Sequence, residues 1–209
     1  MRKKERALWL IDELKRLYPD AHCALNYQTP FQLLIATILS AQCTDERVNQ
    51  VTETLFKTYP DVFAFAEANL AELELAVKPT GFYRNKALSI LETSQRLVAL
   101  HQGEVPCDMQ ALTALRGVGR KTASVVMGNA FNAAEGVVVD THVGRLSRRM
   151  GLTRHQQPEK VEQDLMRLIP RSEWVLFPHL MISHGRGPCK SRKADCAKCP
   201  LEHHCPALL

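Results

Sequence analysis

Apolar residues recur at helical spacing along almost the whole chain, and this pattern limits the possible folds more than any other feature. Residues three and four positions apart share one face of an α-helix, so each repeat predicts one amphipathic helix. The clearest repeats are Leu10, Ile11, Leu14 and Leu17; Phe31, Leu34, Ile35 and Ile38; Val48, Val51 and Leu55; and Ala87, Ile90, Leu91, Leu97 and Val98. Only residues 136–139 have the β-branched character of a strand, and four residues are too few to build a sheet. We therefore expect an all-α fold.

Three positions carry signals for where helices begin. Thr29 precedes Pro30, which places an N-cap side chain directly before a proline at the first helical position. Thr44 precedes two acidic residues, and a helix dipole favours negative charge in the first turn. Pro178 interrupts a later apolar stretch, which predicts a helix start or a kink at that point.

The composition indicates a globular protein with a weak preference for a polyanionic partner. The chain has 209 residues, of which 45% are hydrophobic, enough for one large domain or two small ones. Lys and Arg outnumber Asp and Glu by 27 to 22, which leaves a formal charge of +5. The apolar run after Arg6 stops at Asp12, and no apolar stretch reaches the ~20 residues of a membrane helix. We expect a soluble, intracellular protein with no membrane contact.

Residues 112–126 predict the end of one helix, a tight turn with two glycines, and a second helix that begins at Arg120. Glycines on both sides of Val118 permit positive φ and a close approach of the backbone. Amide N–H groups at the start of the second helix, together with the helix dipole, form a site for one phosphate. Such a turn binds DNA without reading its sequence. The candidate contact residues are Gly117, Val118, Gly119 and Arg120. An ordinary helix–helix connection has the same pattern and remains an alternative.

Lys121 and Asp140 are the candidate catalytic residues. Lys121 lies in the first turn of the second helix, where the dipole and Arg120 both disfavour a positive charge, and a nucleophilic lysine acts as a neutral amine. The alternative role for Lys121 is a solvated phosphate contact. Asp140 follows a buried apolar run and precedes a helix, so it can serve as the N-cap. An ionised carboxylate at that position also suits the stabilisation of an oxocarbenium cation, and both roles can hold together.

Four of the seven cysteines fall within the last 21 residues, with the spacing Cys-x6-Cys-x2-Cys-x5-Cys. They are Cys189, Cys196, Cys199 and Cys205. In a reducing compartment such a cluster indicates metal ligation rather than disulfides. Only the central pair resembles the short hooks of a zinc site, so the spacing favours an iron-sulfur cluster and leaves zinc as an alternative. Lys190, Arg192 and Lys193 lie between the first two cysteines and are candidates for phosphate contact. A purely structural staple for a tail that lacks a core is the other interpretation.

The turn at residues 115–123, the segment Val139–Val143 and the cysteine spacing, in this order, resemble the endonuclease III family of helix-hairpin-helix DNA glycosylases. The resemblance extends to Leu39-Ser40-Ala41-Gln42 and to Thr80-Gly81-Phe82-Tyr83. It implies two α-helical domains with DNA in the groove between them. One is a six-helix domain at residues 23–134, which contains the hairpin, and the other is an iron-sulfur domain made of residues 1–22 and 135–209.

The resemblance also implies a function: a bifunctional DNA glycosylase and abasic-site (AP) lyase in base excision repair. It would remove oxidised pyrimidines from duplex DNA and cleave the strand 3′ to the abasic site by β-elimination. Lys121 would be the nucleophile and Asp140 its carboxylate partner, while Gln42 would fill the vacated stack and Phe82 would act as a wedge. The four cysteines would hold a [4Fe–4S] cluster. The partner would be duplex DNA with oxidised bases or abasic sites, and the protein a cytoplasmic, nucleoid-associated monomer.

Three positions depart from the family pattern: Arg116 replaces a proline, Phe82 a leucine, and Thr113 an acidic residue. Arg116 affects the stiffness of the hairpin and phosphate binding. Phe82 affects which lesion or opposite base is tolerated. Two other functions share most of these motifs. A monofunctional mismatch glycosylase lacks a lysine at the position of Lys121, and a noncatalytic iron-sulfur DNA-binding module needs neither Lys121 nor Asp140.

Overall fold

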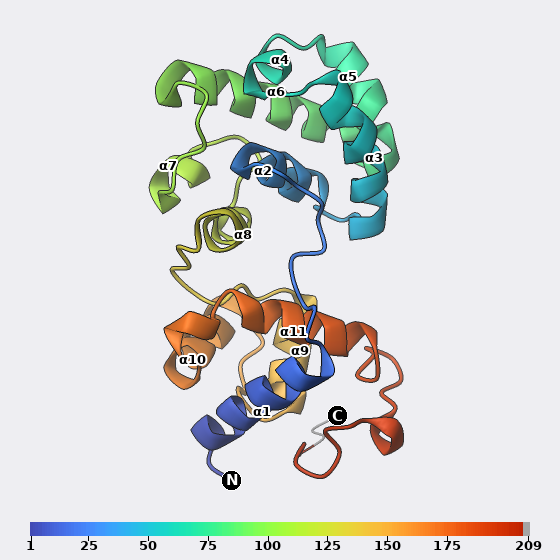
Figure 1. Ribbon diagram of the computed structural model, residues 1–209, viewed down its shortest axis with the longest axis vertical. Coiled ribbons are helices and arrows are strands. Elements are labelled where there is room, and N and C mark those ends of the chain that lie inside the picture. The colour runs from blue at the N-terminus through green and yellow to red at the C-terminus, as the bar shows by residue number, and fades with distance from the viewer. Residues whose placement is uncertain (207–209) are drawn as a thin grey trace. The chain divides into compact units, whose positions relative to one another are not determined.

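The computed structural model describes residues 1–206 and confirms the all-α prediction, with no strand in that range (Figure 1). The chain divides into two compact units. Unit 1 contains Met1–Cys23 and the residues from Ala134 onward, and unit 2 contains Ala24–Ala133. Residues 136–139, which alone had strand character, form an extended lead into the next helix. Within the described residues, no helix combines the length and apolarity that a membrane crossing requires.

Unit 2 carries seven α-helices, one more than the six that the resemblance implies, and two of them have only five residues each. They are α2 (Pro30–Leu39), α3 (Asp45–Thr58), α4 (Val62–Ala66), α5 (Leu70–Val77), α6 (Tyr83–His101), α7 (Met109–Thr113) and α8 (Arg120–Phe131), with a 3-10 turn, η1 (Lys78–Thr80), before α6. The longest helix, α6, packs against α4 and α5, and α2 packs against α8 (Figure 1). Unit 2 is thus organised around α6.

Unit 1 combines the N-terminal helix with the C-terminal part of the chain. Its helices are α1 (Lys3–Leu17), α9 (Thr141–Arg149), α10 (Pro158–Leu168) and α11 (Leu176–Arg186), with short 3-10 turns η2 (Arg171–Glu173) and η3 (Cys196–Lys198). Both α1 and α9 pack against α10 and α11 around a shared apolar core. Pro178 lies in the first turn of α11, which confirms the predicted helix start. After α11, residues 187–206 contain no regular helix except η3.

Polar side chains cap several helices at their first turn, as the sequence predicts. The Thr29 hydroxyl accepts a hydrogen bond from the Gln32 amide at 3.2 Å, and Pro30 follows at the first helical position of α2. The Thr44 hydroxyl likewise accepts from the Arg47 amide at the start of α3. Each cap satisfies one of the four amide N–H groups that a helix start leaves without a partner.

The core of unit 2 is centred on one aromatic residue. Phe65 on α4 is fully buried, and three aromatic rings surround it. The ring centroids of Phe31, Phe56 and Tyr59 lie 5.4, 6.4 and 5.1 Å from that of Phe65. A helix of five residues cannot be stable alone, so this aromatic packing holds α4 against its neighbours.

We expect Phe65→Ala to lower the free energy of unfolding by about 3–5 kcal/mol, because the large cavity cannot collapse among the three remaining aromatic rings. Phe63 is the matched control, since it lies on the same helix but is 52% exposed. Phe63→Ala should cost about 1 kcal/mol or less. Urea unfolding followed by circular dichroism measures both values. Equal losses in the two variants would contradict the central role of Phe65.

Candidate DNA-binding and catalytic site

The hairpin between α7 and α8 is built on a glycine that no other residue could replace without a shift. Gly117 has φ +75°, and a Cβ at this position would lie 2.8 Å from Cβ of Ser89 on α6. Val118 is buried and its amide donates to the Leu115 carbonyl at 3.3 Å, which closes the turn. Positive φ and lack of space both require glycine here. The hairpin is therefore pressed directly onto α6.

The start of α8 lies at the surface and has no side-chain cap. Gly119 is its N-cap residue and supplies no side chain to cap the first-turn amides. The first backbone bond of the helix runs from the Ala123 amide to the Gly119 carbonyl, and Gly119, Arg120 and Lys121 are exposed. Exposed N–H groups at the positive end of a helix dipole form an anion site that can take one phosphate.

The two candidate catalytic residues lie in different units. Lys121 is the second residue of α8 in unit 2, and its side chain is exposed. Asp140 is the N-cap of α9 in unit 1, where its Oδ1 accepts a hydrogen bond from the Val143 amide at 2.7 Å. The predicted N-cap role of Asp140 is thus confirmed. This bond satisfies one of the amide N–H groups that the start of α9 would otherwise leave without a partner.

Gln42 and Phe82 occupy two exposed turns of unit 2, and both adopt a backbone conformation that is rare for residues with a side chain. Their φ angles are +54° and +48°. Phe82 is 64% exposed, which excludes a role as a core aromatic. Left-handed φ in a bulky residue carries strain that the surrounding structure must hold in place. Both residues are therefore displayed on the surface at a cost in stability.

The departures from the family pattern are accommodated by local contacts. Arg116 forms an ion pair with Glu92 on α6, with Nη1 3.4 Å from Oε2, and both side chains are about half exposed. The Arg116 carbonyl accepts a hydrogen bond from Thr93 Oγ1 at 2.9 Å. Thr113 donates its hydroxyl to the Met109 carbonyl at 2.7 Å within α7. The hairpin that lacks its proline is thus tied to α6 by other bonds.

The four C-terminal cysteines line one hollow in unit 1. Cys189, Cys196, Cys199 and Cys205 are all half-buried and share this hollow with Arg149 and His184, among others. Burial raises the pKa of the Cys199 thiol, and the other three cysteines raise it further. An all-sulfur donor set at one place fits an iron-sulfur cluster. Among residues 1–206, no three or more His, Cys, Asp or Glu side chains are placed so that they could hold a single metal ion.

Two arginines of α9, which sequence reasoning missed, hold the start of the cysteine-rich loop. Arg149 donates to the carbonyls of Lys190 at 2.7 Å and Ser191 at 2.9 Å, and its Nη1 lies 3.5 Å from Cys189 Sγ. Arg145 donates to the Cys189 carbonyl at 3.1 Å. Because Asp140 caps the same helix, α9 links the candidate carboxylate to the cysteine-rich loop within one unit.

Sequence reasoning also missed a set of contacts that joins Tyr18, His184 and Cys199. His184 is buried, and burial lowers its pKa to about 4, so its imidazole is neutral. Its Nδ1 lies 3.0 Å from the Tyr18 hydroxyl and its Nε2 lies 3.6 Å from Cys199 Sγ. A neutral imidazole has one donor and one acceptor. When the Tyr18 hydroxyl donates to Nδ1, the Nε2 proton faces the Cys199 sulfur.

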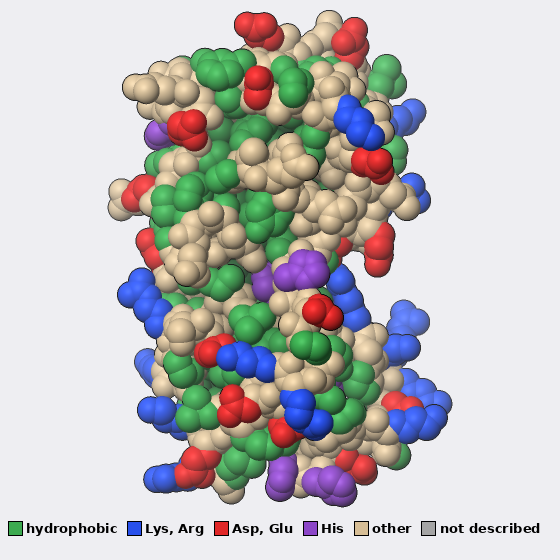
Figure 2. Space-filling model, in the orientation of Figure 1, with side chains coloured by type: hydrophobic (Ala, Val, Ile, Leu, Met, Phe, Trp, Pro, Cys, Tyr) green, Lys and Arg blue, Asp and Glu red, His purple; other side chains and the backbone are tan. Residues whose placement is uncertain are grey.

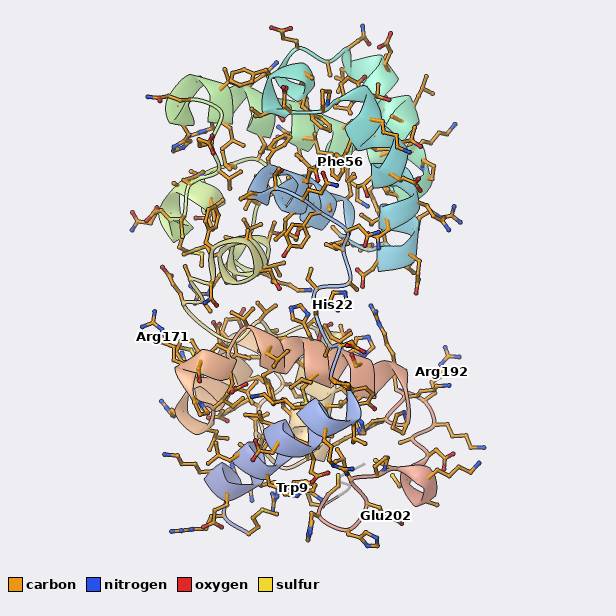
Figure 3. The ribbon with its side chains drawn as sticks, in the orientation of Figure 1. Trp9, His22, Phe56, Arg171, Arg192 and Glu202 are labelled. Carbon is orange, nitrogen blue, oxygen red and sulfur yellow. The ribbon has the colours of Figure 1, made fainter. Side chains whose placement is uncertain are left out.

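The candidate basic residues Lys190, Arg192 and Lys193 are exposed on the loop between Cys189 and Cys196. Figure 2 shows Lys and Arg side chains gathered at this edge of unit 1, and Figure 3 shows Arg192 directed outward from the loop. Their charges are available to a polyanion, because none of the three side chains is buried.

An all-helical fold with a glycine hairpin pressed onto a long helix, and a second hairpin helix that starts with exposed amides, defines the helix-hairpin-helix class. The model of the "HhH-GPD superfamily base excision DNA repair protein" family matches residues 35–171. The chain is 52% identical to endonuclease III of Synechocystis sp. over 98% of this chain and 94% of that protein. It is 38% identical to endonuclease III of Escherichia coli over 97% of this chain and 95% of that protein.

Solved structures agree with the sequence relatives. A trapped endonuclease III–DNA covalent intermediate matches with a TM-score of 0.91 and 44% identity, covering 98% of this chain and 96% of that one. A thermostable thymine-DNA glycosylase matches with a TM-score of 0.82 at 22% identity, which indicates a shared fold. The chain belongs to the endonuclease III family within the HhH-GPD superfamily of base excision DNA repair proteins. The resemblance drawn from the motifs is confirmed.

We expect Gly117→Ala to lower the free energy of unfolding by about 1–3 kcal/mol and to weaken binding to undamaged duplex DNA, because the added Cβ meets Ser89 at a positive φ. Gly119→Ala is the control, since its φ is −85° and no atom lies within 4 Å of an added Cβ. That variant should lose about 1 kcal/mol or less. Thermal unfolding and fluorescence anisotropy measure the two effects. Unchanged stability in Gly117→Ala would show that the hairpin does not depend on contact with α6.

Proposed function

We propose that this chain is a bifunctional DNA glycosylase and AP lyase that removes oxidised pyrimidines from duplex DNA and cleaves the strand 3′ to the abasic site. The observation that carries this proposal is Lys121, an exposed lysine in the first turn of the second hairpin helix, beside a phosphate-binding set of amides. A phosphate held at those amides would bring the sugar of a bound nucleotide close to an amine that can act as a nucleophile.

The chemistry assigned to Lys121 is a covalent substitution followed by an elimination. The neutral amine forms a bond to C1′ while the glycosidic bond breaks, and the base leaves with the bonding electrons and takes up a proton. The sugar ring opens to a protonated Schiff base. Loss of a proton from C2′ then expels the 3′ phosphate, which breaks the strand. Asp140, held as a carboxylate at the start of α9, stabilises the positive charge that develops at the sugar.

Gln42 and Phe82 are assigned to the opening of the duplex. The damaged nucleotide must leave the base stack before an amine can reach C1′. Phe82 provides an exposed apolar wedge that can enter between bases, and Gln42 provides a polar side chain that can fill the space of the extruded base. The positive φ at both residues supports a functional role, because neither residue is a helix C-cap and strained backbone conformations cluster at functional sites.

We further propose that Cys189, Cys196, Cys199 and Cys205 hold a [4Fe–4S] cluster, which makes unit 1 the cluster domain and unit 2 the hairpin domain. The cluster would stabilise residues 187–206, which have almost no regular helix. The loop that bears Lys190, Arg192 and Lys193 would then be held rigid for phosphate contact. Because the substrate is chromosomal DNA and the curated relatives compared above are bacterial, we place the protein in the cytoplasm at the nucleoid.

The proposed function predicts that sodium borohydride traps the protein on duplex DNA that carries an abasic site or an oxidised pyrimidine. Reduction converts the Schiff base into a stable amine, so a covalent protein–DNA adduct appears on a denaturing gel. Lys121→Ala should abolish the adduct on both substrates. Lys160→Ala serves as the control, because Lys160 is also an exposed lysine in the first turn of a helix.

The pattern of adducts separates the alternatives. Base removal without an adduct would indicate a monofunctional glycosylase, and binding without either reaction would indicate a noncatalytic DNA-binding module. An adduct that survives in Lys121→Ala would show that another amine is the nucleophile.

The cluster assignment predicts equal amounts of iron and acid-labile sulfide in protein purified without oxygen, with a broad visible absorbance. Cys199→Ser should lose most of the iron and make residues 187–206 sensitive to protease, because the loop then lacks its main constraint. Cys107→Ser, an exposed cysteine in unit 2, should retain the full iron content. One zinc ion per chain, with no iron, would refute the assignment.

A further inference from the structure

Lys86 on α6 is a buried lysine with two specific hydrogen-bond acceptors. Its side chain is 5% exposed, and burial lowers its pKa. The amine donates to the Leu39 carbonyl at 2.8 Å and to the Thr80 carbonyl at 2.7 Å. A buried amine is costly unless its protons have partners, so these two bonds explain why a lysine is tolerated at this position.

Both acceptor carbonyls lie at the ends of helical segments, directly before the two exposed turns. Leu39 is the last residue of α2, three positions before Gln42, and Thr80 is the last residue of η1, two positions before Phe82. Carbonyls at such ends have no partner within their own helix and carry the negative end of the dipole. One nitrogen atom therefore connects two segments that are separated by about forty residues.

Each turn also has local bonds, but these bonds act within one turn only. Ser40 donates its hydroxyl to the Thr37 carbonyl at 2.8 Å, and the Cys43 amide donates to the Ser40 carbonyl at 3.1 Å. Thr80 donates its hydroxyl to the Val77 carbonyl at 2.8 Å. Such contacts set the shape of a turn, whereas the two bonds of Lys86 bridge the segments that precede the Gln42 turn and the Phe82 turn.

The same face of α6 holds the hairpin. Ser89 and Thr93 lie three and seven positions after Lys86, which is the spacing of one helix face. Ser89 packs beneath Gly117, and Thr93 donates its hydroxyl to the Arg116 carbonyl at 2.9 Å. One stripe of α6 thus fixes all three elements that are assigned to DNA contact in unit 2.

We propose that Lys86 is a positioning residue for duplex opening, which fixes the spacing between the Gln42 turn and the Phe82 turn so that both side chains enter the base stack together. This inference rests on the proposed function of the two turns. Lys86 is buried, so it does not touch DNA and takes no part in the chemistry at Lys121. Its loss should therefore slow reactions that require a paired base to leave the stack, and spare reactions at a site where neither strand carries a base.

The test compares two duplexes in single-turnover experiments with cluster-loaded, full-length protein. In the first duplex, an oxidised pyrimidine is paired with a purine beside a 2-aminopurine, whose fluorescence reports unstacking. In the second, an abasic site faces a stable tetrahydrofuran site, so neither strand has a base to displace. Lys86→Met removes the donors at similar length. Lys86→Gln is the second variant in case the methionine variant does not fold; it keeps N–H donors, but its side chain is one atom shorter, so we do not expect it to reach both carbonyls.

We expect Lys86→Met and Lys86→Gln to lower the rate on the first duplex by about tenfold or more, since small misplacements of positioning groups have effects of this size. The increase in 2-aminopurine fluorescence on the first duplex should become smaller as well. The yield of the borohydride-trapped adduct on the second duplex should stay within about twofold of the wild type. Lys86→Arg, which keeps donors, should restore part of the first rate. Ser94→Ala is the control, since Ser94 is buried on α6 and its hydroxyl donates to the Ile90 carbonyl of its own helix.

Equal losses on the two duplexes would overturn the inference, because they would indicate a general effect on folding or on Lys121. Unchanged rates on both duplexes would overturn it as well. If the wild-type protein neither cleaves the first duplex nor forms an adduct with the second, the proposed function itself fails, and the inference fails with it. If the wild type is active on both duplexes, the proposed function stands and the variants test the role of Lys86 alone.

Discussion

The exposed turns of unit 2 depend on how α6 satisfies backbone groups that its neighbours leave without partners. The helices α2 and η1 end in carbonyls that need donors, and Lys86 supplies both from a buried position. Further along the same helix, Thr93 bonds the hairpin carbonyl of Arg116, and Ser89 leaves room only for glycine at position 117. A single rigid helix of nineteen residues therefore aligns three short segments that have little regular structure of their own.

In unit 1, α9 likewise holds an irregular segment by bonding its backbone groups. The first residue before α9 is Asp140, whose carboxylate caps the helix, and the last turns of α9 carry Arg145 and Arg149. These arginines bond the backbone at the start of the cysteine-rich loop. A change in that loop would therefore act on the helix that positions the carboxylate. The bonds from α9 therefore connect the cysteine-rich loop to the proposed carboxylate, apart from the phosphate contacts proposed for the basic residues of the loop.

Of the four non-glycine residues with positive φ among residues 1–206, two lie in the turns that the proposed function uses, and the other two, Gln102 and Asn132, are helix C-caps. Gln42 and Phe82 have positive φ although both carry side chains, and Phe82 exposes most of an aromatic ring. Each feature lowers stability, and the closely packed cores around Phe65 in unit 2 and around α9 and α11 in unit 1 compensate for this. Lys86, which bonds the segments before both strained turns, is buried and so does not look like a DNA-binding residue.

Local patterns in the sequence were sufficient to predict the all-α class, the helix starts at Thr29 and Thr44 and the N-cap role of Asp140. They were also sufficient to predict membership of the endonuclease III family. Caps, helix faces and motifs depend on residues that lie only a few positions apart. The tertiary structure alone revealed Lys86, the two arginines of α9 and the contact of Tyr18 with His184. These contacts join residues that lie 6 to 166 positions apart, most of them more than 40, and periodicity carries no information over such distances. Burial decided the rest: only the folded chain shows that Phe82 is exposed and Lys86 is enclosed, the reverse of what their side-chain types suggest.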